Sequence, residues 1–340
     1  MPAPSPEPHD APSLSERPGA DLITEAAGEL RFDAVTADVT ADEARGQLQE
    51  RKLGVGFWIA AAWLGFLTTL AVLAPWLPFI EDPNDIDALA LRQPPAWQEG
   101  GSWNGSLSST FHLLGADDLG RDLLARVVWG ARVSLFIGVA AVVLGFLIGG
   151  TIGLTAGYFR GRFEKIFMSA MDIMLAFPAL ILALAIVTFL SEPGSQDASL
   201  GTITLTLTIL AIPALARITR ASTLTFAQRE FVQAARTLGA KNGRIIIREI
   251  LPNVIPPMVS FSLIAVAIVI VAEGGLSFLG LSVSAPTATW GNMINEGRTA
   301  LEIAPWIAFV PCLVMFFTLL ALNYAGDQLR RRFDVKEVRL

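Results

Sequence analysis

The chain has 340 residues, of which 53% are hydrophobic and only 16% are charged. In soluble domains, roughly a quarter of all residues are charged. This composition excludes an ordinary soluble domain and indicates a membrane protein with several spans. The net charge of −6 does not describe a uniformly acidic surface, because the charges are segregated along the chain. The basic residues form no stripe, so nucleic-acid binding is not expected, and the single Cys312 cannot form an internal disulfide.

The first segment, residues 1–50, is rich in Pro, Ala, Asp and Glu and poor in large apolar residues. Such a segment cannot bury enough apolar surface to fold, so we predict a disordered tail, with a helix over 41–52 as the alternative for its last part. The tail is not a secretory signal, because the first hydrophobic run begins too late and is too long.

Six apolar runs follow, and each is predicted to span the membrane as a helix. They cover residues 55–77, 131–157, 166–190, 200–216, 254–279 and 305–324. Pro178 and Pro213 lie inside the third and fourth runs, where prolines are tolerated if neighbouring groups satisfy the freed carbonyl. We therefore expect an all-α polytopic protein. Its parts are 51–127 with the first helix and a long hydrophilic loop, 128–327 as a core with five helices, and 328–340 as a C-terminal tail.

The distribution of Lys and Arg predicts the orientation, because cytoplasmic segments carry an excess of these residues. Five lie in the tail, three in the loop at Arg160, seven in the region from Arg217 and five from Arg330 onward. The other side has five, namely Arg92, Arg121, Arg126, Arg132 and Arg298. Both termini and the loop over 217–253 are therefore predicted to face the cytoplasm, and the 82–126 loop is predicted to face the outside.

The second apolar run carries glycines at intervals of four residues, with Ala141 in register before them. The four glycines are Gly145, Gly149, Gly153 and Gly157. Residues four apart share one face of a helix, and small residues there let a second backbone approach closely, which drives association in lipid. We predict a close helix–helix contact along this face. The partner helix could belong to this chain or to another.

Residues 230–252 form the longest strongly basic stretch between two apolar runs. Residues 231–238 favour a helix, Gly239 stands where a helix commonly ends in a left-handed residue, and Asn242 can cap a second helix. Pro252 is predicted to end that second helix, and Pro256 and Pro257 are predicted to keep the chain non-helical until the next span. The expected result is a helix, a glycine turn and a helix that project from the basic side of the membrane.

This stretch resembles the signature loop of bacterial ABC-importer permeases. The triplet at 233–235, Gly239 and the triplet at 250–252 fall on its positions, although Gln233 replaces the usual acid and Glu249 stands where relatives often have His. Three further stretches strengthen the resemblance: LGADDLGRD at 114–122, MDIMLAFP at 171–178, and EGGLSFLGL at 273–281 followed by WGNMI at 290–294. Together they are similar to the dipeptide/oligopeptide/nickel permease family, specifically its second permease subunit, from about residue 51 to the C-terminus.

The resemblance implies a type I ABC-importer permease fold with six transmembrane helices and a cytoplasmic coupling helix, which docks into a groove of an ATPase subunit. The implied coupling residues are Gln233, Ala234, Ala235, Leu238, Gly239, Ala240 and Pro252. The implied partners are a paralogous permease, two ATP-binding ATPase subunits and an extracytoplasmic solute-binding protein. The implied location is the bacterial inner membrane, and no cofactor is implied.

Residues 115–122 mimic a phosphate-binding loop, but they lack the Lys-Ser/Thr pair, and Asp117 and Asp118 would repel a phosphate. Two interpretations of this stretch stay open: a cap region near the partner permease and the binding protein, or a structural glycine turn with capping acids. No other stretch matches the nucleotide-binding pattern. The two histidines, His9 and His112, belong to no metal-binding cluster, and no nucleophile is paired with a base. We therefore expect no catalytic and no metal site.

The predicted function is that of a permease subunit of an ATP-driven importer, which forms half of the pathway for peptides or a related small solute. The alternative is a stand-alone ion-coupled secondary transporter or channel, which would need ionisable residues deep in the spans and often a second internal half. Asp172 and Glu273 are the only acids in or at the edge of the spans, and no internal repeat is visible. Asp172 is expected to pair with Lys165 or Arg162, and Glu273 is expected to face water near the outer end.

Overall fold

The computed structural model describes residues 54–78, 80–103, 111–191, 198–281, 283 and 286–337. The tail predicted over 1–50, with its alternative helix, lies outside these residues. The described residues are helical and form no strand; only two isolated bridges pair extended segments. Five of the described helices are long and apolar enough to span a membrane, and a sixth span results if one bent helix pair counts as a single span. The predicted all-α polytopic fold is thus confirmed.

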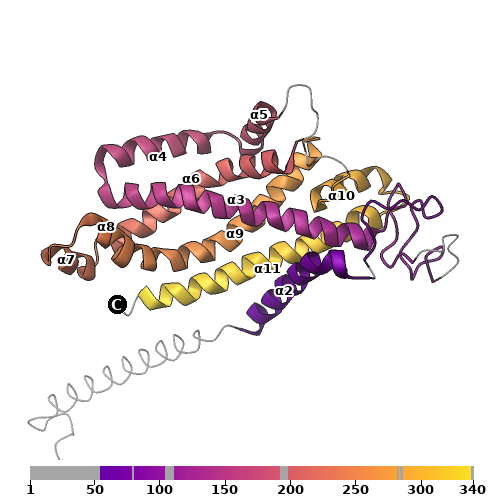
Figure 1. Cartoon of the computed structure of the whole chain (residues 1–340), viewed down its shortest axis with the longest axis horizontal. Coiled ribbons are helices and arrows are strands. Elements are labelled where there is room, and N and C mark those ends of the chain that lie inside the picture. The colour runs from indigo at the N-terminus through magenta and orange to yellow at the C-terminus, as the bar shows by residue number, and fades with distance from the viewer. Residues whose placement is uncertain are drawn as a thin grey trace, which may run out of the picture. The chain divides into compact units, whose positions relative to one another are not determined.

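Two long helices, α3 (Leu123–Phe159) and α6 (Leu200–Phe226), lie side by side and share the most extensive contact of the described chain (Figure 1). The helix α3 begins earlier than the predicted residue 131, because Asp122 caps its first turn by accepting a hydrogen bond from the Ala125 N–H at 2.7 Å. The helix α6 continues through Pro213 and ends well beyond the predicted residue 216. This pair forms the centre of the core, where Ile137, Ile203 and Leu207 are almost fully buried.

The third predicted span is broken into two helices. The helices α4 (Gly161–Ala176) and α5 (Ala179–Leu190) meet at 99° (Figure 1). A single helix with a tolerated proline is therefore not what forms over 166–190. The proline ring clashes with a helical conformation of the preceding residue, and Phe177 accordingly has extended angles (φ −79°, ψ 140°) before Pro178.

The basic stretch forms α7 (Glu230–Thr237), a turn, the short α8 (Asn242–Arg244) and a π-helical turn η3 (Ile245–Ile250) that leads directly into α9 (Leu251–Phe278). The helix, the turn and the second helix are present as predicted. The predicted interruption at Pro252, Pro256 and Pro257 is wrong, because the chain is helical without a break from Asn242 to Phe278.

Two local features accommodate the start of α9 at Pro252. In the π turn, the Leu251 N–H donates to the Ile246 carbonyl, five residues back, so the hydrogen-bond register changes directly before the proline. The Asn253 side-chain amide donates to the Glu249 carbonyl at 2.6 Å. Pro252 has no backbone N–H to donate, and this side-chain donor reaches a carbonyl three residues before it.

The remaining helices surround this core. The helix α2 (Val55–Leu73), continued by η2 (Ala74–Trp76), packs on α11 (Trp306–Glu337), and α11 packs on α9. The helix α11 continues beyond the predicted end at residue 324. A short helix that was not predicted, α10 (Trp290–Gly297), is followed by η4 (Arg298–Ala300) and lies at the opposite end of the helix bundle from α7 (Figure 1). Trp290 fixes α10, because its ring is fully buried and its indole N–H donates to the Val127 carbonyl at 3.1 Å.

Candidate functional site

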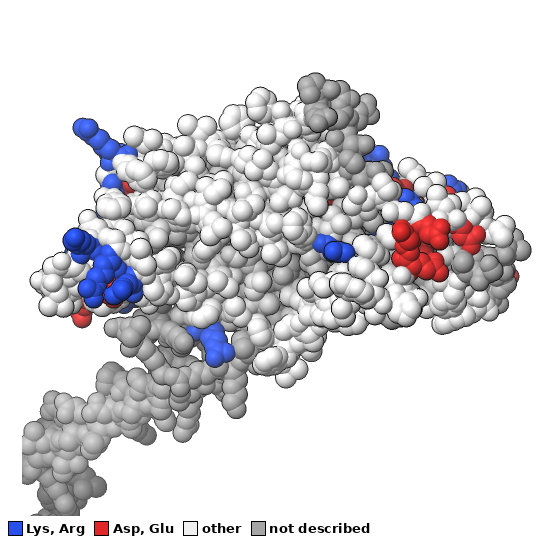
Figure 2. Space-filling model, in the orientation of Figure 1, with Lys and Arg blue, Asp and Glu red and all other residues white. Residues whose placement is uncertain are grey.

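Charged side chains gather at the two ends of the helix bundle (Figure 2). Lys and Arg lie where α7 and α8 project, Asp and Glu lie over the long loop that precedes α3, and the face between them carries few charges. The basic residues of α7, α8, η3 and the positions that join them are Arg229, Arg236, Lys241, Arg244 and Arg248. An apolar belt between two polar ends is the surface expected of a protein that crosses a membrane.

The α7–α8 segment is attached to the helix bundle through a buried face. Val232 and Ile245 are fully buried in a cluster with residues of α3, α6 and α9. Tyr158 near the end of α3 donates its hydroxyl to Asn242 Oδ1 at 2.9 Å, and the Arg236 guanidinium lies 5.3 Å from the centre of the Tyr158 ring. These contacts hold the segment as a rigid projection rather than a loose loop.

Gly239 makes the turn between α7 and α8. Its φ of +77° is a left-handed conformation that favours glycine, and an added Cβ would meet no atom within 4 Å, so the requirement is conformational and not steric. The Gly239 N–H donates to the Arg236 carbonyl and the Ala240 N–H to the Ala235 carbonyl, both at 3.0 Å, which closes the end of α7. The turn leaves the side chain of Leu238 88% exposed.

Six of the seven predicted coupling residues come together on α7 and its turn. Gln233, Ala234, Leu238 and Gly239 are exposed and form a surface that we call the α7 tip. The other two, at positions 235 and 240, are half-buried against the cluster that anchors the segment. Pro252 is exposed but lies in the first turn of α9, outside the tip.

The four glycines of α3 face α6. A Cβ at Gly149 or Gly153 would lie 2.5 or 2.3 Å from a carbonyl oxygen of α6, and the nearest α6 atoms to a Cβ at Gly145 or Gly157 would be 3.1 and 2.8 Å away. Real Cβ atoms essentially never lie closer than 3.0 Å to such atoms, and 3.1 Å is tighter than most real contacts, so side chains at these positions would push the helices apart. The helix that approaches the glycines therefore belongs to this chain, a choice that the sequence left open.

At the opposite end, two arginines and two acids join the long loop, α3 and α10. Asp117 lies 2.7 Å from Arg121 and 3.4 Å from Arg126, and Glu296 lies 3.0 and 3.2 Å from the same two guanidinium groups. Arg126 is only 1% exposed, so its charge depends on these partners. The network fastens α10 to the start of α3.

The acids of the 114–122 stretch serve local structure. Asp117 accepts hydrogen bonds from the backbone N–H groups of Leu119 and Arg121 at 2.9 and 3.0 Å, and Asp122 caps α3. These contacts describe a glycine turn with capping acids, which is one of the two interpretations considered for this stretch.

Two groups of the long loop bind protons more tightly than usual. The hydrogen bond between His112 Nδ1 and Asp122 Oδ1, 3.1 Å long, raises the pKa of His112 above its ordinary value despite the burial of the ring. Burial raises the pKa of Glu81, and the negative charge of Asp122 raises it further. Proton uptake therefore stabilises this loop.

Both acids within the spans have partners other than those expected. Asp172 pairs with Arg217 of α6 at 2.5 Å, so the expected pairing with residue 162 or 165 is wrong. Glu273 does not face water: it is 2% exposed, and its Oε1 accepts a hydrogen bond from the Thr289 hydroxyl at 2.8 Å. The same Thr289 hydroxyl accepts from the Asn292 N–H and caps α10, so Glu273 helps to position that helix.

Sequence reasoning missed the place of Glu296 in the charged network and the exposure of Ile247. Glu296 lies outside every recognised motif, and its partner Arg126 is 170 residues away, so no local pattern marks the pair. Ile247 is 64% exposed on the π turn η3. The three consecutive isoleucines at 245–247 could have indicated this exposure, because a helical turn cannot bury three consecutive side chains on one face.

Comparison with known proteins defines the family. The family described as "Binding-protein-dependent transport system inner membrane component" matches residues 149–336. The chain is 40% identical over 228 residues to the glutathione transport system permease protein GsiD of Pectobacterium atrosepticum, which covers 67% of this chain and 74% of the relative. It is 39% identical over 267 residues to the di/tripeptide transport system permease protein DppC of Pseudomonas aeruginosa, covering 78% and 83% of the two chains.

A solved structure of the MetNI methionine ABC transporter in an inward-facing conformation has the same fold, with a TM-score of 0.53 at 18% identity over 62% of this chain and 97% of the matched chain. The chain belongs to the family of binding-protein-dependent transport system inner membrane components. It is a multi-pass permease component of an ABC importer, as the resemblance of its basic stretch predicted.

Proposed function

We propose that this chain is one of two paralogous permease subunits of an importer for peptides or a peptide-like solute, and that it forms half of the translocation pathway. The names of its relatives, a di/tripeptide and a glutathione permease, support this class of solute. Two ATPase subunits bind on the side of α7, and a solute-binding protein delivers cargo on the side of the long loop.

The α7 tip is the docking surface for an ATPase subunit in this proposal. The observation that carries the assignment is Leu238, an 88% exposed leucine on a segment that is anchored by the fully buried Val232 and Ile245. Leu238 shares an exposed surface with the motif residues Gln233, Ala234 and Gly239, and the small side chain at position 234 leaves a narrow ridge that fits a groove. The surrounding arginines and lysine suit an acidic groove rim.

The experiment replaces Leu238 with glutamate in the complete importer. Loss of a buried leucine contact costs about 1.5–3 kcal/mol, and burial of the new charge adds to it, so affinity for the ATPase subunits should fall at least about tenfold. Recovery of the ATPase subunits with the affinity-tagged permease measures this loss. Leu89→Glu is the matched control, because Leu89 is 67% exposed in the long loop at the other end. Equal recovery of the subunits with both variants would contradict the docking assignment.

The proposed orientation places both termini and the α7 tip in the cytoplasm. In a Cys312→Ser background, Lys241→Cys should react with a membrane-impermeant maleimide only after the membrane is opened, whereas Leu89→Cys should react in intact cells. The stand-alone ion-coupled alternative makes a separate prediction: an uncoupler would abolish uptake while the ATP concentration is held constant. Uptake that persists under those conditions supports the ATP-driven importer.

A further inference from the structure

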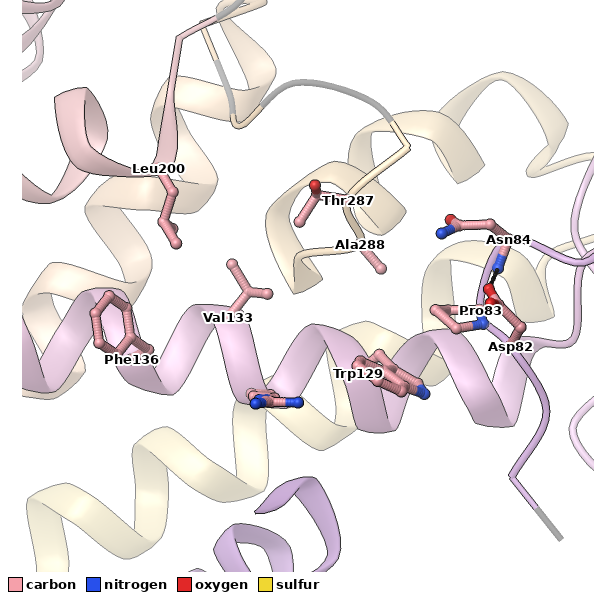
Figure 3. Close-up of a pocket in the computed structure, with 10 residues that line it drawn as sticks. Asp82, Pro83, Asn84, Trp129, Val133, Phe136, Leu200, Thr287 and Ala288 are labelled. Atoms are coloured by element: carbon pink, nitrogen blue, oxygen red, sulfur yellow. Dashed lines mark hydrogen bonds between the residues drawn. The ribbon is translucent and has the colours of Figure 1, made fainter. Parts of the chain in front are cut away.

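A cavity of about 500 Å³ opens beside the charged network, at the end of the molecule that carries the long loop (Figure 3). Four parts of the chain line it: loop residues 82–84, the helix α3, the start of α6 and the segment before α10. Its volume lies within the range of about 300–1,000 Å³ that is typical of small-molecule sites. None of the predicted coupling residues contributes to it.

The two ends of this cavity differ in chemistry. Phe136 and Leu200 form an apolar end, Asp82 and Asn84 form a polar end, and Val133 lies between them (Figure 3). Asp82 Oδ1 accepts a hydrogen bond from the Asn84 backbone N–H at 2.8 Å, which orients the carboxylate. A ligand that spans the cavity therefore meets an anion at one end and apolar side chains at the other.

Arg132 adds a cation to the wall that α3 contributes. It lies one helical turn from both Trp129 and Phe136, and its guanidinium carbon is 5.6 Å from the centre of the Trp129 ring. An aromatic ring holds a guanidinium in place while leaving its N–H groups able to bind a carboxylate. Within the described part of the chain, neither Arg132 nor Asp82 forms an ion pair with another residue.

We propose that this cavity is a binding site for the transported solute where it enters the permease, and that the solute is a short peptide with free termini and an apolar side chain. The Asp82 carboxylate receives the peptide ammonium group, Arg132 donates to the peptide carboxylate, and Phe136 and Leu200 cover the apolar side chain. One unpaired anion and one unpaired cation on an apolar wall match a zwitterion, whereas Asp82 would repel a purely anionic ligand such as an acidic lipid. The proposal rests on the importer function proposed above.

The first test places a photo-reactive p-benzoylphenylalanine at Phe136 in the complete importer, with its binding protein and ATP. Phe136 is 55% exposed, so the substitution does not disturb the core, and Phe309 of α11, 56% exposed, is the matched control. Radiolabelled Ala-Phe is the probe. We expect label at position 136, competed by unlabelled peptide, and no label at position 309.

The second test adds Arg132→Gln to the photo-reactive importer. Loss of a charge-assisted hydrogen bond should raise the peptide concentration for half-maximal labelling about tenfold, and Arg132→Lys should restore part of it. Arg298→Gln is the matched control, because the Arg298 guanidinium also lies over an aromatic ring, 5.9 Å from the centre of Phe278, outside the cavity. This control should change the labelling less than about twofold, whereas equal effects of the two Gln variants would overturn the role of Arg132.

The remaining outcomes separate the site from the function. The site proposal is overturned if the probe at position 136 labels a lipid, the partner permease or the binding protein but not the peptide. Peptide uptake by the same importer would still support the proposed function in that case. If the importer with unmodified permease takes up no peptide at all, the proposed function fails and the site proposal fails with it.

Discussion

The contact between α3 and α6 makes a sharp prediction for Gly153→Ala. The added Cβ would lie 2.3 Å from the Ala216 carbonyl oxygen, so the two helices must separate by roughly 1 Å to reach an ordinary contact of about 3.5 Å. Overpacking of this kind costs about 1–3 kcal/mol. The clash is with backbone, which no change of rotamer can relieve.

A matched control lies on the same helix. Gly150 is also buried, but its added Cβ would lie 3.8 Å from the nearest atom, the Thr219 hydroxyl oxygen. Gly150→Ala should therefore be neutral, or stabilising by up to about 1 kcal/mol because alanine favours the helix. Thermal unfolding in detergent, followed by the fraction that stays monodisperse, compares the two variants. A loss of about 2 kcal/mol corresponds to a fall of roughly 5 °C in midpoint.

A rescue experiment distinguishes steric overlap from other effects of alanine. At Gly145 the closest atoms belong to side chains, with the Ala211 Cβ 3.1 Å away. Gly145→Ala should be partly restored by Ala211→Gly, whereas no side-chain change on α6 should restore Gly153→Ala. If Gly153→Ala unfolds at the same temperature as Gly150→Ala, the close approach of the two helices is not what these glycines provide.

Two further predictions concern the long loop and its ionic contact with α10. The pKa of His112 is raised in the folded state, so its contribution to stability is fully present below the unfolded pKa of about 6.5. This contribution is lost as the pH rises through the folded-state pKa. In a series of thermal-shift measurements at different pH values, His112→Gln should flatten the loss, whereas His9→Gln, in the tail, should not. Glu296→Gln leaves the buried Arg126 with Asp117 as its only acid partner among the described residues and should cost about 1 kcal/mol, discounted because the Glu296 side chain is 44% exposed; an unchanged unfolding midpoint would show that the network contributes little.

Apolar length predicted the helical spans well, because this signal is local. Whether a proline interrupts a helix could not be predicted from the local sequence. Pro178 stands in a run that reads as one span, yet the chain bends there; Pro252 reads as a helix end, yet the helix continues. The difference lies in neighbouring groups, since a π turn and the Asn253 amide adjust the hydrogen bonds around Pro252, while Phe177 takes an extended conformation before Pro178.

In the candidate site, too, features that are close in sequence could be predicted and contacts between distant segments could not. The predicted coupling residues follow one another along the chain, so their spacing could be recognised. Glu273 could be seen as an acid near a helix end, but its burial against Thr289 follows from α10, a helix too short to predict from its apolar pattern. The cavity draws its wall from four separated segments, and no sequence pattern brings Asp82 and Arg132 together.

The helix that runs without a break from Asn242 to Phe278 connects the two ends of the helix bundle. Its 37 residues span about 55 Å, with the α7 tip attached near one end and Glu273 near the other. Glu273 holds Thr289, which directly follows the cavity residues Thr287 and Ala288. If an ATPase subunit docks on the α7 tip as proposed, a tilt imposed there would be carried along this helix towards Thr289 and the cavity residues that precede it.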